Sequence, residues 1–490
     1  MRRIPPKQKA ASAYTSAREH RRAAVLQRQR AARRELTYNL RALISNAIDK
    51  EEPGAETGED DSRQDQALEE TCDGAPMAMD EGGAQGSTQY FDEKGAHPNK
   101  RVRGKQAQFY ASQFSIPEWM VDIPRDLNGH LSTEEGGGWF VMPRPEGKRC
   151  LMVASGGITV TRLMNGEVLH RFPSALPNGS PRAKGPKDGW TLLDCIYSEA
   201  SRTYFVLDLL CWRKMELYDC TCEFRFFILR SKFEEELGRS GAGGGAGGAG
   251  GAGGAGGGAE AAGGYLLEPL PYFECDSNGL RRAYGDYAPF VRDGLLFWSK
   301  QSYVEIGPSP LVLLWKDMKC SRYFLRETQQ QQQQQHHHHP PLSCVLLVQK
   351  AKGEDGEKSG YVLSTLDDVV LGRTTLEEVN AWGLGQVQDG RAGGEREEEE
   401  QMLIRFWYEG ATEDEKNNQQ QLHGLQFDRK CSSKRAVADA WSKLLFHARA
   451  KKGIREGGTA VTFDTLLQAV ERPVQKEVRE ESNDVEGMMC

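Results

Sequence analysis

The hexapeptide RPEGKR, residues 144–149, places three cations and one carboxylate around Gly147. The hydrophobic run CLMVAS at 150–155 follows it and is typical of a β-strand. Arginine and lysine can hold phosphates, and a lysine amine with a depressed pKa can attack a nucleotide covalently. The first position of this stretch is Arg144, and a guanidinium cannot deprotonate at working pH. Lys148 stands four residues further on, after the glycine, so the stretch predicts a nucleotide pocket more readily than a nucleophile.

The elements around this stretch are short hydrophobic runs between about Phe109 and Phe324, separated by Gly, Asn, Asp and Pro. They lie at 150–155, 157–163, 167–172, 191–197, 203–212, 294–298 and 310–316. MNGE at Met164–Glu167 predicts an Asn-Gly hairpin turn, and FRFFILRSKF at 224–233 predicts the start of a helix. We therefore expect an antiparallel α+β domain over residues 105–325, with the Gly/Ala-rich tract 238–264 inserted in a surface loop.

The order of these runs resembles the nucleotidyltransferase domain of mRNA capping enzymes (guanylyltransferases) and ligases. RPEGKR stands where these enzymes read K-x-D-G-x-R, and TLLDCIY (191–197) stands where they read T-L-L-D-G-E. TYFVLDLLCW (203–212), RDGLLFW (292–298) and LVLLWKD (311–317) resemble their R-Y-L-I-x-D-I, D-G-L-I-F and L-L-K-W-K in the same order. The resemblance implies a nucleotidyltransferase-like fold built on antiparallel sheets.

Three departures from the enzyme pattern bear on activity. Arg144 replaces the lysine nucleophile, Ile196 replaces the glutamate of the third motif, and Leu314 replaces the first lysine of the last motif. Nucleophile, acid and one phosphate clamp are therefore absent together. We predict a binding protein and no enzyme, with no catalytic residue, no metal site and no cofactor.

The N-terminus is strongly polarised in charge. Residues 1–50 carry 13 Lys/Arg and 3 Asp/Glu, whereas residues 51–81 carry 1 basic and 12 acidic residues. The capping box Ser16-x-x-Glu19 predicts a helix start, and Leu36, Leu40, Leu43 and Ile44 fall on one helical face. We expect a basic amphipathic helix in 1–50 and a disordered acidic linker over 51–104. Such a helix can lie on RNA phosphates, on a membrane surface, or in an acidic protein groove.

The N-terminal helix is similar to an importin-β-binding domain, and the two halves together resemble the snurportin family of import adaptors. The likeness of the core is carried by QFSIPEWMVDIPRDL (113–127), EGKRCLMVAS, HRFPSALPNG, TLLDCIYSEASRTYFVLDLLCWR and DGLLFWSKQSYVEIGPSPLV. The resemblance implies binding of trimethylguanosine-capped spliceosomal snRNA, presentation of the snRNP to importin-β, and no catalysis. It further implies recycling by an exportin, shuttling between nucleus and cytoplasm, and no membrane contact. The importin-binding residues that it implies are Arg21, Arg22, Arg30, Arg33, Arg34, Leu36, Leu40 and Arg41.

A reader of this cap needs an aromatic face for the cationic base and few acceptors near the methylated N2. The resemblance implies Trp315 as the stacking ring, Ile116 as the opposite wall and Trp119 as a neighbour of the cap. Arg149 and Lys316 would approach the sugar or the phosphates. An ungapped comparison puts the family tryptophan on Leu314, and a one-residue slip turns a strand side chain to the other face. Either a bulge restores Trp315 to the pocket, or Trp315 is core and another ring such as Trp298 stacks.

The remaining segments are less informative. We expect a Gln/His-rich linker at 326–342, a small α+β or OB-like module at 343–475, and a tail at 476–490. The start of the chain has no apolar stretch typical of a signal peptide, and no run reaches the ~18 apolar residues of a membrane span. The 11 cysteines are scattered, which favours a reducing compartment.

Two hypotheses from other classes compete with the import adaptor. The chain would be a capping-type guanylyltransferase if Lys148 served as an atypical nucleophile, and GTP would then leave a covalent adduct. It would be a general RNA-binding protein if the N-terminal helix held RNA, with an affinity that depends on salt and not on the cap.

Overall fold

The protein is described by a computed structural model. It describes residues 6–31, 110–111, 113–130, 137–181, 189–237, 259–261, 264–285, 289–317, 342–350, 360–382, 401–414, 419–431, 437–456 and 460–471. The expected linkers at 51–104 and 326–341, most of the Gly/Ala tract and the tail from 476 lie outside these residues.

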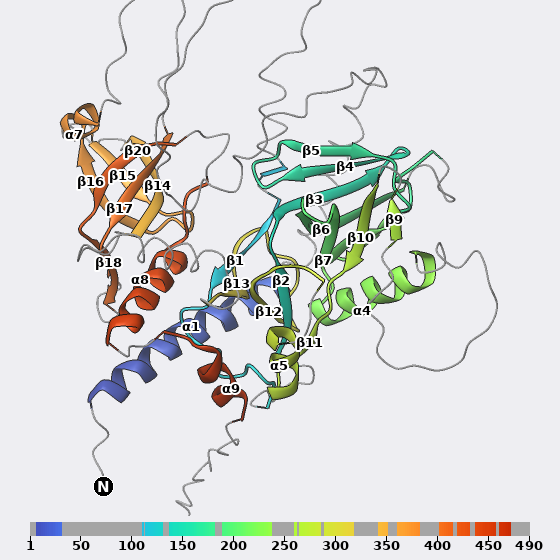
Figure 1. The fold of residues 1–490 in the computed structure, drawn as a ribbon. Helices are drawn as coiled ribbons and strands as arrows, with labels where there is room; N and C mark the ends of the chain where they lie inside the picture. The colour runs from blue at the N-terminus through green and yellow to red at the C-terminus, as the bar shows by residue number, and fades with distance from the viewer. Residues whose placement is uncertain are drawn as a thin grey trace, which may run out of the picture.

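The larger sheet has the strand order β5-β4-β3-β6-β7-β10-β9, with β8 paired to β7 (Figure 1). Its members are β3 (Lys148–Ser155), β4 (Ile158–Leu163), β5 (Val168–Phe172), β6 (Trp190–Ser198), β7 (Thr203–Trp212), β8 (Met215–Glu216), β9 (Ala259–Ala261) and β10 (Tyr265–Pro269). All neighbours are antiparallel except β7 and β10, which run parallel. The predicted Asn-Gly turn joins β4 to β5, since the Leu163 amide donates to the Glu167 carbonyl at 2.8 Å.

A second sheet has the order β1-β13-β12-β2-β11. It is built from β1 (Ser115–Trp119), β2 (Trp139–Pro145), β11 (Phe273–Glu274), β12 (Arg292–Ser299) and β13 (Gly307–Trp315). Successive side chains along these strands point to opposite faces of the sheet, so they pack in two different hydrophobic clusters. Leu296, Trp298, Val312 and Leu314 face the larger sheet and meet Ile196 and Phe205 there, together with residues of α4 (Cys222–Lys232). The predicted helix in this region is therefore present, and Thr221 caps it by accepting from the Phe224 amide.

The opposite face of the second sheet packs on the C-terminal elements. Leu295, Phe297, Leu313 and Trp315 belong to one cluster with residues of the C-terminal sheet and two helices. That sheet has the order β16-β15-β14-β17-β20 and is antiparallel throughout. Its elements and neighbours are β14 (Leu342–Lys350), β15 (Gly360–Ser364), β16 (Val370–Thr375), α7 (Leu376–Ala381), β17 (Gln401–Tyr408), β18 (Gly410–Asp414), β19 (Gln419–His423), β20 (Gln426–Lys430), α8 (Trp441–Glu456) and α9 (Phe463–Glu471). Residues 343–475 thus share a core with the preceding domain.

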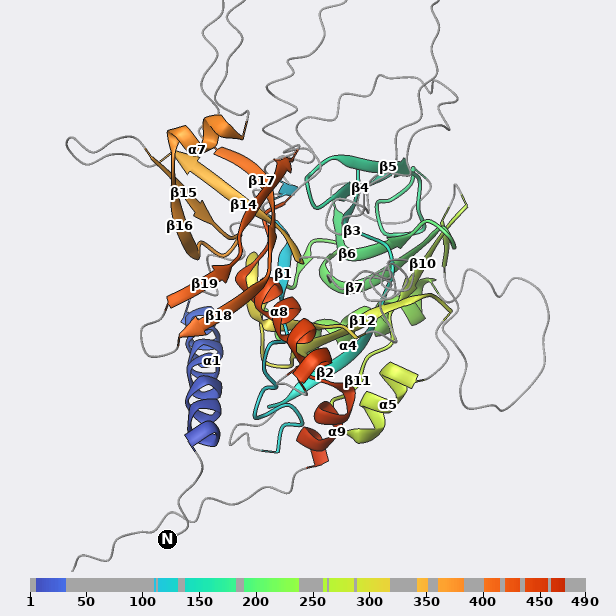
Figure 2. The same cartoon turned by 60° about the vertical axis from the view of Figure 1, so that its left-hand side comes forward.

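The N-terminal helix α1 (Pro6–Ala31) begins earlier than the sequence indicated. The predicted capping box at Ser16 lies inside the helix, so that prediction was wrong. The reason is local: proline suits the first helical position, and the Lys, Gln and Ala that follow Pro6 are good helix formers. Figure 1 shows the C-terminal end of α1 toward β13, and Figure 2 shows the helix next to β18.

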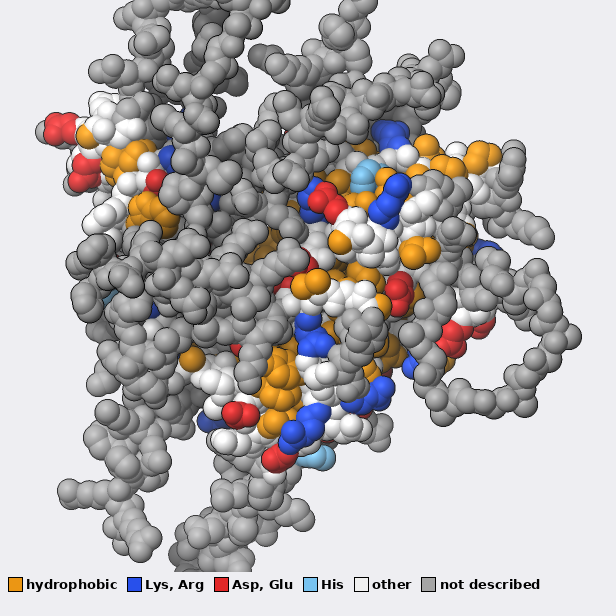
Figure 3. Space-filling model, in the orientation of Figure 1, with side chains coloured by type: hydrophobic (Ala, Val, Ile, Leu, Met, Phe, Trp, Pro, Cys, Tyr) orange, Lys and Arg blue, Asp and Glu red, His pale blue; other side chains and the backbone are white. Residues whose placement is uncertain are grey.

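The expected α+β class with antiparallel sheets is confirmed. None of the helices in the described part of the chain is long and apolar enough to cross a membrane. None of the eight cysteines that the structure describes forms a disulfide. Figure 3 shows a face on which Lys and Arg side chains are interspersed with Asp and Glu rather than gathered in one basic area.

Candidate functional site

The RPEGKR stretch forms the turn between β2 and β3, and Gly147 is required there. Its φ of +153° is unfavourable for other residues, and a Cβ atom would lie 2.3 Å from the Tyr197 carbonyl oxygen. The Glu146 amide donates to the Val291 carbonyl at 2.8 Å. The turn is therefore held between the end of β6 and the start of β12.

A cleft of about 340 Å³ opens beside this turn. This volume lies within the range of small-molecule sites, about 300–1,000 Å³. Its lining comprises the turn, the loop after β6 and the approach to β12, namely Glu146, Gly147, Lys148, Tyr197, Ser198, Glu199, Ala200, Ser201, Pro289, Phe290 and Val291. We call it the turn cleft.

The turn cleft combines two aromatic side chains with charges of both signs. Phe290 is half-buried and meets Phe205 edge-on at 4.8 Å between ring centroids. Burial raises the pKa of Tyr197, so its hydroxyl stays protonated at neutral pH. Lys148 is ion-paired with Glu199. An aromatic wall with carboxylates beside it suits an aromatic ligand that carries positive charge.

On the other side of the turn, Asp293 joins two cations. The register of β12 with β2 shifts between Arg292 and Leu295, which marks a bulge. Gly294 lets the bulge approach β13 closely, because a Cβ there would lie 2.5 Å from the Trp315 carbonyl oxygen. Asp293 accepts from Lys316 Nζ at 2.8 and 2.9 Å and is also ion-paired with Arg144.

The three positions that depart from the enzyme pattern all have structural roles. Arg144 is held in its ion pair with Asp293. Ile196 is 1% exposed and Leu314 is 7% exposed, and both pack in the cluster between the two sheets. Among the described residues, no group of three or more His, Cys, Asp or Glu side chains is placed to hold a metal ion.

Trp315, the predicted stacking ring, has no exposed face in this structure. The side chain is 0% exposed, and its indole N–H donates to the Val461 carbonyl at 2.8 Å. Tyr284, from the helix α5 (Ser277–Gly285), and Phe463, from α9, lie against the Trp315 ring. Its place in β13 turns it away from the larger sheet, while Leu314 points toward that sheet. The structure therefore places Trp315 in the core rather than in a pocket. Its predicted role in cap binding stays a prediction and requires α9 to move away from the ring.

Trp119 and Lys316, both predicted to lie near the cap, are close to each other in the structure. Lys316 Nζ lies 5.6 Å from the centre of the Trp119 ring. Two rings of α8 also pack against Trp119. The centroid of the Trp119 ring lies 5.1 Å from that of Phe446 and 4.8 Å from that of His447. Ile116 lies on the same strand as Trp119, paired with Pro308, and is half-buried.

Arg149 lies apart from this group. Its Nε donates to Asp194 Oδ1 at 3.1 Å, and a second contact completes a two-point ion pair on the larger sheet. The guanidinium is also 5.9 Å from the Phe114 ring. The structure thus shows the salt bridge that Arg149 makes within the fold, and its predicted contact with a cap stays a prediction.

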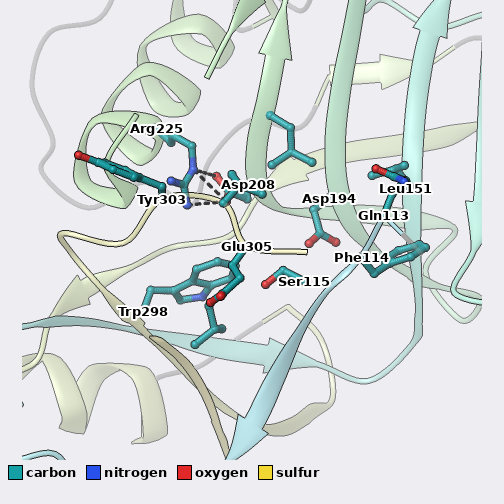
Figure 4. A pocket seen from close by; sticks show the side chains of 13 residues that line it. Gln113, Phe114, Ser115, Leu151, Asp194, Asp208, Arg225, Trp298, Tyr303 and Glu305 are labelled. Atoms are coloured by element: carbon teal, nitrogen blue, oxygen red, sulfur yellow. Dashed lines mark hydrogen bonds and ion pairs between the residues drawn. The ribbon is translucent and has the colours of Figure 1, made fainter. Parts of the chain in front are cut away.

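A narrower pocket lies between the two sheets, beside Asp194 (Figure 4). Arg225 donates to both oxygens of Asp208 at 2.9 to 3.1 Å, and burial raises the pKa of Asp208 although the guanidinium acts in the opposite direction. Trp298 lines the pocket, and its indole N–H has no acceptor among the described residues. The volume of about 10 Å³ holds one water at most, so Trp298 does not present a face to a base.

Of the predicted importin-binding residues, the structure describes Arg21, Arg22 and Arg30 on α1. Arg22 is buried against the folded core, while Arg21 and Arg30 are exposed. Arg33, Arg34, Leu36, Leu40 and Arg41 lie outside the described residues.

Two antiparallel-rich sheets, with the RPEGKR turn and its cleft at the point where the chain passes from one to the other, define an α+β protein with Arg144 at the start of this turn. Residues 113–242 match the family model described as Snurportin1, m3G cap-binding domain. The match is to this part of the chain, which includes the RPEGKR turn and β1 to α4.

Among solved structures, the chain is similar to a mycobacterial DNA ligase D complexed with ATP and MES. The identity is 10%, the TM-score is 0.25, and the likeness covers 66% of this chain and 97% of that one. It is also similar to the ligase domain of LigD from M. tuberculosis, with 9% identity, a TM-score of 0.24, and coverage of 62% and 94%. A Lig E DNA ligase matches with 12% identity, a TM-score of 0.24, and coverage of 65% and 99%.

Sequence reasoning missed two residues of this region. Asp293 appeared only as part of a motif, and its pairing with Arg144 depends on a bulge. The glycine after Asp293 is the one local signal of that bulge, since glycine in a strand often marks one. Phe290 precedes the RDGLLFW run in an irregular segment, and only the folded chain brings it to the turn cleft.

Proposed function

We propose that this protein is a nuclear import adaptor that binds the trimethylguanosine cap of spliceosomal snRNA and presents the snRNP to importin-β, without catalysis. The observation that carries the proposal is the match of residues 113–242 to the snurportin cap-binding domain. In the proposed role the chain shuttles between cytoplasm and nucleus, and an exportin returns it.

The chemistry of the turn cleft supports a methylated guanine as ligand. N7-methylation gives the base a positive charge, which favours contact with an aromatic ring, worth about 0.5–2 kcal/mol. Phe290 offers that ring, and Glu146 and Glu199 supply negative charge nearby. Lys148 lies on the same wall, where the cap phosphates would meet it.

The arrangement of Arg144 speaks against the guanylyltransferase hypothesis. A guanidinium paired with Asp293 cannot serve as a nucleophile, and Ile196 offers no carboxylate to a metal. Lys148 is engaged with Glu199.

An equilibrium titration of the full chain with trimethylguanosine cap, monomethyl cap and GTP tests the proposal. Intrinsic tryptophan fluorescence reports binding, and we expect saturation at the lowest concentration with the trimethyl cap. A preference for GTP, or equal affinity for all three ligands, would exclude cap recognition as the function of this domain.

A further inference from the structure

Helix α1 is docked on the folded core along a strip of carboxylates. The strip consists of Glu118 on β1, Asp122 after β1, Glu305 before β13 and Glu413 on β18, with side chains that are 6–16% exposed. They come from three separate segments of the chain, since Glu118 and Asp122 are four residues apart, and the fold brings these segments together. Figure 1 shows the C-terminal end of the helix near β1 and β13.

The helix presents one face to this strip. Arg18 lies 3.5 Å from Asp122 and 3.4 Å from Glu413, and Arg22 lies 3.4 Å from Asp122. Arg21 pairs with Glu118. The positions 18, 21, 22, 25 and 29 follow helical spacing, so a single side of α1 carries the contact.

The contact continues at the C-terminal end of the helix. Arg28 is ion-paired with Glu305, and the Gln29 side chain accepts from the Tyr303 amide at 3.0 Å. Val25, at 8% exposure, lies between the two groups of charges. Salt screens ion pairs between partly buried side chains less than exposed ion pairs, so we expect the docking of α1 to persist at physiological ionic strength.

The helix face that contacts the strip includes residues expected to bind importin-β. Arg22 is 6% exposed in this structure, and Arg21 is engaged by Glu118. An acidic partner must displace the chain's own carboxylates before it can reach these side chains. A docked helix is therefore a competitor for any partner that binds the same face.

We infer that the carboxylate strip is an intramolecular docking site for α1, and that it competes with an acidic-groove partner for the same arginine face. The inference deepens the proposed function and rests on it for the identity of the partner. Only molecules with α1 released can bind the partner, so the apparent affinity equals the intrinsic affinity multiplied by the released fraction. Weakening the strip should therefore raise that affinity, although no residue that touches the partner is changed.

The test uses the full chain with Asp122→Asn and Glu305→Gln. The matched control is Glu234→Gln and Glu235→Gln, which removes two exposed carboxylates in the π-helical turn just after α4, away from the strip. Amide hydrogen exchange over residues 18–31 reports docking, and a titration with importin-β reports competition. We expect faster exchange in the strip variant and affinity for importin-β that is higher by about threefold to tenfold, with no change in the control.

Each outcome decides between the inference and its alternatives. Unchanged exchange in the strip variant would overturn the docking site. Faster exchange with unchanged importin-β affinity would overturn the competition. If no variant binds importin-β while exchange responds as expected, the partner in the proposed function is wrong and the competition falls with it, whereas the docking of α1 stands. Substitutions Ala24→Glu and Gln27→Glu, both on the exposed side of α1, should leave the exchange of the helix unchanged.

Discussion

Arg144 is ion-paired with Asp293 across neighbouring strands, at the position where the enzymes that this domain resembles have a lysine nucleophile. The pair converts that position from a reactive amine into a fixed structural cation. Lys316 binds the same carboxylate, so two cations share Asp293. At this position the chain therefore has a guanidinium held in an ion pair in place of a lysine amine.

Restoring the lysine should not restore transfer. In Arg144→Lys the new amine still faces Asp293, and Ile196 still offers no metal ligand. We expect no covalent GMP on either the wild-type chain or the variant after incubation with labelled GTP and Mg²⁺, followed by denaturing gel electrophoresis. A labelled band on the wild-type chain would revive the guanylyltransferase hypothesis, and its loss in Lys148→Ala would identify the nucleophile.

The buried pair of Asp208 and Arg225 should be sensitive to removal of one partner. Asp208→Ala leaves the Arg225 guanidinium, 1% exposed, without its counter-charge. We expect a loss of about 3–5 kcal/mol in the free energy of unfolding, measured by urea denaturation. The exposed pair of Arg230 and Glu234 is the comparison, where Glu234→Ala should cost ~0.5 kcal/mol or less. Equal costs at the two sites would show that the Asp208 pair is not desolvated.

Phe290 and Trp315 should differ in what their substitution changes. Phe290→Leu removes the aromatic face from the turn cleft, so we expect cap affinity to fall about tenfold with a stability change of ~1 kcal/mol or less. Cap affinity is measured by calorimetry and stability by urea denaturation.

Trp315→Ala opens a hole between β13 and α9 and should destabilise the fold by about 3–5 kcal/mol. The milder Trp315→Phe keeps the core filled and should bind the cap as the wild type does. If Trp315→Phe instead abolishes cap binding without unfolding the chain, Trp315 is the stacking ring and α9 moves aside.

Acid should destabilise the contact between α8 and β1. Burial lowers the pKa of His447 well below its usual value, and Lys443 and Lys316 act in the same direction. The unfolded chain takes up a proton near pH 6.5 whereas the folded chain does not, so stability is complete above that pH and falls below it. We expect a loss of up to about 1.4 kcal/mol per pH unit from this group.

Urea midpoints of wild type and His447→Phe between pH 7.5 and 5 measure the effect. The phenyl ring keeps the edge contact with Trp119 but has no proton to gain. The variant should therefore show a shallower pH slope than the wild type. Parallel slopes would mean that His447 titrates equally in both states.

The elements around the turn cleft were predictable because their signals are local. The hydrophobic runs from Cys150 to Trp212 bury one or both faces in the larger sheet, and an alternating or apolar run bounded by turns is sufficient to predict such strands. The Asn-Gly turn at Asn165 needed only two residues to be recognised. The parallel pairing of β1 with β13 is different, because it joins segments about 190 residues apart and has no local signal.

The orientation of side chains at the site was not predictable. Whether Trp315 or Leu314 faces the larger sheet depends on strand register, and one residue of slip reverses the answer. Arg149 was a candidate for phosphate contact, but its partner Asp194 lies on the adjacent strand and both side chains are turned toward the same space. The docking of α1 depends on four carboxylates from three separate segments, so a sequence pattern could indicate a basic helix but not what it contacts.

The most direct test of the adaptor account is a bridging measurement. Importin-β is immobilised, and labelled RNA carrying a trimethylguanosine cap is added with and without the full chain. The account predicts that RNA is retained only when the chain is present, and that free trimethylguanosine cap releases it at concentrations where GTP does not. Retention that is equal for capped and uncapped RNA, or binding of the chain to importin-β with no retained RNA, would contradict it.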